Sequence, residues 1–211
     1  MTKSIDSLKW RYAVKKFNDR RMLSKDKITL LKEAFNLTAT SYGLQPIRLV
    51  VLQNKGLQEQ LVPHSFGQQQ VAQASHILVI CIERNIDADF ISDYFRRVRK
   101  VRNTPKEVLI PYEEALLSDF SQKETESIRQ WCVNQAYLAM GNLLTVCAME
   151  KIDSCPMEGF VPQAYDDMLH LGERGLQAAL VLPVGYRADD DMFSSFKKVR
   201  KDLKDSIVEI E

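Results

Sequence analysis

Two basic segments near opposite ends of the chain carry the residue types best suited to binding an anion. Residues 9–27 hold eight cations against two acids, and residues 197–204 hold five cations against one acid. If the two segments meet in the fold, their arginine and lysine side chains would form a pocket for a phosphate. A third basic segment, residues 96–106, has six cations and no acid. We interpret this third segment as solvated surface.

Other catalytic patterns are absent from the sequence. It has no GxSxG nucleophile elbow, no GxxxxGK[ST] P-loop and no HExxH zinc motif. The four cysteines form no CxxC pair and the three histidines are scattered, so we expect no metal site. The acidic runs at 113–114, 166–167 and 189–191 lie in polar stretches, and we expect them to be exposed. If the protein is an enzyme, a bound cofactor is expected to carry the chemistry and no side chain is assigned a catalytic role.

The two basic segments resemble the ends of one known pattern. RYAVKKFN at 11–18 is similar to the N-terminal signature R-x-S-x-[RK]-x-F-[DN] of the nitroreductase family of FMN enzymes, with alanine at the serine position. Lys198 and Arg200 resemble the family's C-terminal K-x-R. In that family both stretches hold the phosphate of the flavin. The resemblance implies six phosphate-binding residues: Arg11, Tyr12, Ala13, Lys15, Lys198 and Arg200.

Three segments between these ends extend the resemblance. ATSYGLQPIRLVVL (39–52) is similar to the family's stretch before the first central strand, although the family's asparagine is Gly43 here. FGQQQVAQASHILVICI (66–82) resembles its amide-rich turn, and DSCPMEGF (153–160) contains the most specific match, P-M-E-G-F. The loop at 40–45 is expected to reach the flavin of a partner subunit. The resemblance implies ten further flavin-binding residues: Thr40, Ser41, Gly43, Gln45, Gln68, Gln70, Pro156, Met157, Glu158 and Gly159.

The resemblance also implies an activity. An FMN oxidoreductase of this family takes hydride from NADH or NADPH and passes it, by a ping-pong mechanism, to nitroaromatics, quinones or similar small-molecule acceptors. We expect the substrate pocket to include Tyr42, Leu117 and Phe120. Two alternatives stay open. One is the same fold with a different flavin reaction, such as dihydropteridine reduction, dehalogenation or flavin fragmentation. The other is an FMN-binding protein without turnover.

The elements that must position these residues follow from hydrophobic patterning. Apolar runs at 47–53, 76–83 and 178–186 predict strands, and the second is apolar enough to be buried on both faces. Residues 123–150 contain no proline and predict one long helix, whose apolar second half suggests burial by a partner subunit. The alternating ending SIVEIE (206–211) predicts a strand that docks onto another chain's sheet.

Length and composition agree with a single domain over residues 1–211. The class is α+β. The resemblance implies the three-layer α/β/α nitroreductase fold, with a mixed, mostly antiparallel sheet, surrounding helices and a C-terminal strand swapped within a homodimer. The 29 cations and 28 acids nearly balance, which argues against nucleic-acid binding. No apolar run is long enough to cross a membrane and no signal peptide is visible, so we expect a cytoplasmic protein.

Overall fold

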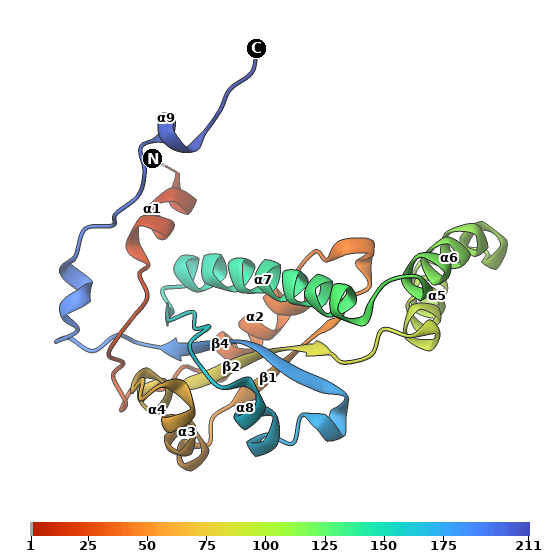
Figure 1. Ribbon diagram of the computed structural model, residues 1–211. Coiled ribbons are helices and arrows are strands. Elements are labelled where there is room, and N and C mark those ends of the chain that lie inside the picture. Colours follow the sequence, from red (N-terminus) through yellow and green to blue (C-terminus); the bar gives the residue numbers. More distant parts are fainter. Residues whose placement is uncertain (1) are drawn as a thin grey trace.

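A four-stranded sheet forms the centre of the computed structural model, which describes residues 2–211 (Figure 1). The strands lie in the order β1 (Ile47–Leu52), β2 (His76–Glu83), β4 (Leu176–Gly185) and β3 (Asp153–Ser154), and each neighbouring pair is antiparallel. One parallel contact is added by the bridge between Ala13 and Ser154. The prediction of a mixed, mostly antiparallel sheet is confirmed.

Strand β2 is buried on both of its faces, as its apolar run predicts. Leu78, Ile80 and Ile82 belong to one hydrophobic cluster, whereas Ile77, Val79 and Cys81 belong to a second cluster on the other side of the sheet. Successive side chains of a strand point to opposite faces, so an uninterrupted apolar run needs a core on each side. The sheet is therefore the middle layer of three.

Helices cover both faces of the sheet and confirm the α/β/α layers (Figure 1). The helices of one layer are α2 (Lys25–Asn36) and the long α7 (Thr125–Met149), and those of the other are α3 (Lys55–Leu61), α4 (Gln70–Gln73) and α8 (Pro162–Met168). α7 matches the long helix predicted over 123–150. Eight of its residues are buried, but Tyr137 and Leu138 remain exposed in the single chain.

Two helices project beyond the end of the sheet (Figure 1). They are α5 (Ala88–Arg102), capped by the Asp87 carboxylate, and α6 (Lys106–Ser121), which begins after Pro105. The arginines and lysine in the second half of α5 are exposed, in agreement with their interpretation as surface. The cations of its last turn also suit the negative end of the helix dipole.

The chain ends in an extension that leaves the sheet and runs beside α1 (Lys3–Trp10) (Figure 1). It contains the short helices η4 (Met192–Ser195) and α9 (Leu203–Ser206). Residues 207–211 are exposed and form no strand with the rest of the described chain, residues 2–206. β1, at one end of the strand order, has no second neighbour among the described residues. Pairing of this tail with a partner's sheet stays a prediction.

Candidate functional site

A cavity of about 340 Å³ lies where the N-terminal and C-terminal basic segments meet. All six residues expected to bind phosphate line it, so the structure brings the two ends of the chain together. The Lys198 ammonium also donates a hydrogen bond to the Arg11 carbonyl across the cavity. We call this cavity the basic cradle, defined by its lining residues: Arg11, Tyr12, Ala13, Lys15, Phe193, Phe196, Lys197, Lys198 and Arg200.

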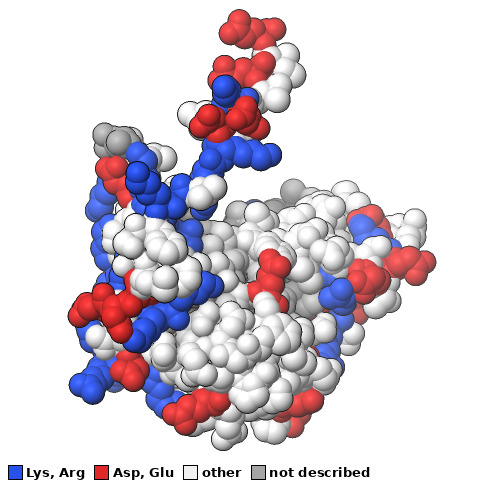
Figure 2. Space-filling view, turned by 60° about the vertical axis from the view of Figure 1, so that its left-hand side comes forward, with Lys and Arg blue, Asp and Glu red and all other residues white. Residues whose placement is uncertain are grey.

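The basic cradle carries five cations, and none of them forms an ion pair with residues 2–211. Burial, followed by repulsion from Arg11 and Arg200, lowers the pKa of Lys198, and burial and Arg200 lower the pKa of Arg11. The Arg11 Nε is buried without a hydrogen-bond partner among residues 2–211. Figure 2 shows blue side chains gathered where the C-terminal extension leaves the body. A phosphate dianion fits this arrangement, since it supplies both the negative charge and the missing acceptor.

Two buried side chains anchor the N-terminal wall of the basic cradle to the core. Val14 and Phe17 are buried in the core, while Lys15 and Lys16 between them are exposed. The Val14 N–H donates to the Ser154 carbonyl at 3.2 Å, which attaches this wall to β3. Although Ala13 lacks the family's hydroxyl, its backbone lies in the bridge to Ser154. Because Ser154 precedes Pro156 by two residues, this attachment brings the basic cradle next to the start of the P-M-E-G-F segment.

Two residues behind the basic cradle were not predicted from the sequence. Asp191 is buried and accepts a hydrogen bond from the Tyr12 hydroxyl. Burial alone would raise its pKa, but hydrogen bonds from Lys15 and Tyr12 hold the pKa of Asp191 below its usual value. Arg187 lies 4.5 Å from the ring centroids of both Trp10 and Tyr12. In the sequence, the acidic run at 189–191 is the feature that could have indicated Asp191. The expectation that this run is wholly exposed is wrong, because Asp191 is buried.

A second acid expected at the surface is also buried. Asp166 accepts hydrogen bonds from the Ala178 N–H at 2.7 Å and from Arg84 at 3.0 Å. It lies at the end of α8 and fastens that helix to β4. Its partners are distant in sequence, so its polar neighbours 163 and 167 give no indication of burial.

Amide side chains join the turn at 68–70 to the P-M-E-G-F segment. Gln68 Nε2 donates to the Gly159 carbonyl at 2.9 Å, and Gln70 Nε2 donates to Gln68 Oε1 at 3.1 Å. Gln70 is buried and also lies 3.9 Å from the Cys155 sulfur. A Cβ added at Gly159 would lie 3.2 Å from Gln68 Nε2, so glycine permits this close approach. We call Gln68, Gln70 and Gly159 the amide cluster.

The residues around Gly159 are held by the sheet on one side and by α7 on the other. Met157, which follows Pro156, is buried and exchanges two backbone hydrogen bonds with Val181, at 2.8 and 3.1 Å. Glu158 accepts a hydrogen bond from Tyr137 of α7 that raises the pKa of the tyrosine. The predicted residues 156–159 thus lie beside the amide cluster, and β3 connects them to the basic cradle.

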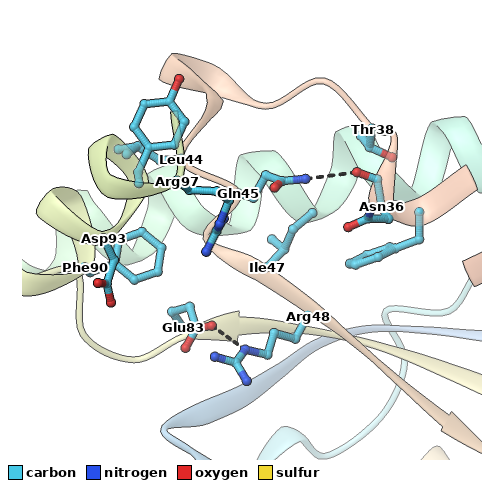
Figure 3. A pocket seen from close by; sticks show the side chains of 12 residues that line it. Asn36, Thr38, Leu44, Gln45, Ile47, Arg48, Glu83, Phe90, Asp93 and Arg97 are labelled. Carbon is cyan, nitrogen blue, oxygen red and sulfur yellow. Dashed lines mark hydrogen bonds and ion pairs between the residues drawn. The ribbon is translucent and has the colours of Figure 1, made fainter. Parts of the chain in front are cut away.

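The loop at 40–45 is bound to different neighbours. The Ser41 N–H donates to Gln135 of α7 at 2.8 Å, and the Gln45 N–H donates to the Thr40 hydroxyl at 3.1 Å. Gln45 also lines a separate cavity of about 310 Å³, where its amide donates to the Asn36 carbonyl (Figure 3). That cavity shares no residue with the basic cradle. Within one chain, these predicted residues therefore do not join the phosphate-binding residues.

An aromatic cluster contains two of the three residues predicted for the substrate pocket. The ring centroids of Tyr42 and Phe120 are 6.1 Å apart, and Trp131 lies 5.2 Å from Phe120. Tyr42 is partly exposed, whereas Phe120 is buried. Leu117 is half-buried against the same core. Of the three predicted pocket residues, Tyr42 has the largest solvent-exposed fraction.

Gly43 is expected to tolerate a side chain poorly. Its φ is +74°, and an added Cβ would lie 2.8 Å from the Tyr94 hydroxyl oxygen. We expect Gly43→Ala to lower the free energy of unfolding by about 2 kcal/mol, measured by urea denaturation. Gly67→Ala is the matched control, because Gly67 has a φ of +73° and nothing within 4 Å of its added Cβ. Equal losses in the two variants would show that contact with Tyr94 contributes nothing.

Residues 2–211 contain neither a cluster of potential metal ligands nor a helix that could span a membrane. No group of three or more histidine, cysteine, aspartate or glutamate side chains is arranged to hold a metal ion. No helix in the same range has the length and apolar character needed to cross a bilayer.

Known proteins resemble this chain along nearly its whole length. The family model described as "Nitroreductase family" matches residues 8–186. A Staphylococcus saprophyticus protein named as an NAD(P)H nitroreductase is 31% identical, covering 97% of this chain and 95% of its own. The crystal structure of a nitroreductase-like protein from Streptococcus mutans is 25% identical, with a TM-score of 0.84 and 98% of each chain covered. A nitroreductase from Exiguobacterium sibiricum, solved in complex with FMN, has a TM-score of 0.83 at 17% identity, covering 100% of this chain and 98% of its own.

Proposed function

Because this chain belongs to the nitroreductase family, we propose that it is an FMN-dependent oxidoreductase that uses NADH or NADPH to reduce nitroaromatics, quinones or similar acceptors. The observation that carries the proposal is the basic cradle, with five cations that lack ion pairs and a buried Arg11 Nε that lacks an acceptor. The E. sibiricum relative contains FMN, which supports the same cofactor here. When bound, FMN supplies the two-electron redox chemistry of the reaction.

The residues of this chain bind and orient that cofactor. Arg11, Lys15, Lys198 and Arg200 would hold its phosphate through charged hydrogen bonds. The amide cluster and the backbone at 158–159 would hold the ring. Among the described side chains, the proposal needs none to act as a general acid, so their contribution is binding, orientation and exclusion of water.

The decisive experiment is a spectroscopic cycle on the purified protein. We expect the preparation to be yellow, to bleach anaerobically on addition of NADH or NADPH, and to recover its colour with a nitroaromatic or a quinone. Initial rates should give parallel double-reciprocal lines, as a ping-pong mechanism requires. A protein that binds FMN without bleaching would support the non-catalytic alternative, and a protein that binds no FMN would contradict the proposal.

We further propose a homodimer, in which the tail of each chain pairs with the partner's β1. The unpaired edge of β1, the exposed Tyr137 and Leu138 of α7, and the separation of loop 40–45 from the basic cradle all support it. Light scattering should give a dimer for the whole chain and a larger monomer fraction for a variant that ends at Asp202. A wild-type monomer with FMN bound would contradict this arrangement.

A further inference from the structure

Asp191 joins the two ends of the chain behind the basic cradle. The residue is 3% exposed, and its Oδ2 accepts hydrogen bonds from the Tyr12 hydroxyl at 2.9 Å and from the N–H groups of Lys15 and Lys16 at 3.0 and 3.3 Å. Its Oδ1 accepts from the Phe193 N–H at 3.2 Å. One buried carboxylate therefore has four donors, and three of them come from positions at least 175 residues away in sequence.

Helix capping explains only one of these four hydrogen bonds. Asp191 precedes η4, and acceptance from the Phe193 N–H is the usual contact of a capping side chain. Of the three remaining donors, Tyr12 and Lys15 line the N-terminal wall of the basic cradle and Lys16 follows it directly in sequence, and none of them has a part in the cap. A connection between the two walls accounts for all four.

The basic cradle needs such a connection because its cations repel one another. Tyr12 and Lys15 line one wall, and Phe193 begins the other. Asp191 hydrogen-bonds to all three without lining the cavity itself. Without a fixed link, repulsion between the walls would favour their separation in the absence of an anion. A buried, multiply hydrogen-bonded carboxylate is well suited to hold them at one spacing.

We propose that Asp191 is the positioning residue for recognition of the flavin's phosphate group. By holding the two walls together, it sets the spacing of the cations, so that a phosphomonoester binds more tightly than the same molecule without its phosphate. The inference rests on the proposed function, since it assumes that the basic cradle receives the phosphate of FMN.

The test compares FMN with riboflavin, which lacks the phosphate. Dissociation constants are measured for both by quenching of flavin fluorescence, in the wild type and in Asp191→Ala. We expect FMN binding to weaken about tenfold or more, while riboflavin binding stays nearly unchanged. Asp190→Ala is the matched control, because Asp190 is an exposed neighbour whose one ion pair among residues 2–211 is with Lys16. This control should leave the FMN-to-riboflavin ratio at the wild-type value.

A second variant keeps the test decisive if Asp191→Ala does not fold, as judged by circular dichroism. Tyr12→Phe deletes a single donor to Asp191, and it should reduce FMN affinity selectively by a smaller factor. Equal weakening of FMN and riboflavin binding in the variant that folds, or no weakening of either, would overturn the inference. Failure of the wild type to bind either flavin would instead contradict the proposed function.

Discussion

Replacing Arg11 with alanine is expected to weaken FMN binding about 100-fold. Arg11 lines the basic cradle, and its Nε is buried without an acceptor. An arginine can offer two parallel hydrogen bonds and a full charge to a phosphate, which lysine or a neutral donor cannot reproduce. The loss should appear in the FMN dissociation constant and, at limiting FMN, in the rate of NAD(P)H oxidation.

The control for Arg11→Ala is Arg20→Ala. Arg20 belongs to the same basic segment, but it is exposed and does not line the basic cradle. Its replacement should change FMN affinity little, apart from a small effect of net charge that added salt removes. If the two variants lose the same factor, the phosphate is held by the overall charge of the segment and the specific role of Arg11 is wrong.

The second large effect is expected from Asp153→Ala, which should lower the free energy of unfolding by about 3–5 kcal/mol. The Asp153 side chain is 6% exposed, and its oxygens accept hydrogen bonds from Arg187 Nε and from the Arg187 N–H, each at 2.8 Å. Arg187 Nη2 lies 2.6 Å from Asp153 Oδ1 as an ion pair. The guanidinium carbon also lies over the rings of Trp10 and Tyr12, 4.5 Å from each centroid. Removing the carboxylate leaves this charge partly buried and unpaired, which is costly in a medium of low dielectric constant.

The same experiment on an exposed ion pair provides the comparison. Glu126 and Arg129 form two hydrogen bonds on the surface of α7, so Glu126→Ala should change the denaturation midpoint little. In addition, Asp153→Ala should weaken FMN binding, because Asp153 begins the strand that attaches to Ala13. A stability loss no greater than that of Glu126→Ala would contradict the assigned role of the buried pair.

Local patterning was sufficient for most of the fold. The strand over 76–83 is present at the predicted bounds, and α7 differs from its predicted range by two residues at the start and one at the end. Both predictions rest on apolar periodicity, which depends only on residues close in sequence. The tail at 207–211 alternates in the same way but forms no strand with residues 2–206, because a strand also needs a sheet edge within reach and the C-terminal extension leaves the sheet (Figure 1).

The candidate site was predicted less completely, since its contacts connect distant segments. Gln70 was expected to face the flavin, which stays a prediction, and the hydrogen bond from its amide to Gln68 was not anticipated. Asp191 was expected to be exposed and is buried, because the N-terminal wall of the basic cradle folds over it. Composition around position 191 contains no information about Tyr12, Lys15 or Lys16.

The sequence by itself therefore determined the central strands, the long helix and which residues carry charge, since apolar runs and residue types are local properties, and the resemblance implied the three layers. Only the tertiary structure decided that two basic segments form one cavity, that β3 connects this cavity to Gly159 and its amide partners, and that a buried carboxylate holds the cavity's walls together. The physical reason is burial. A charged side chain becomes a structural link when the fold excludes water around it and supplies donors, and those donors come from residues far away in the chain.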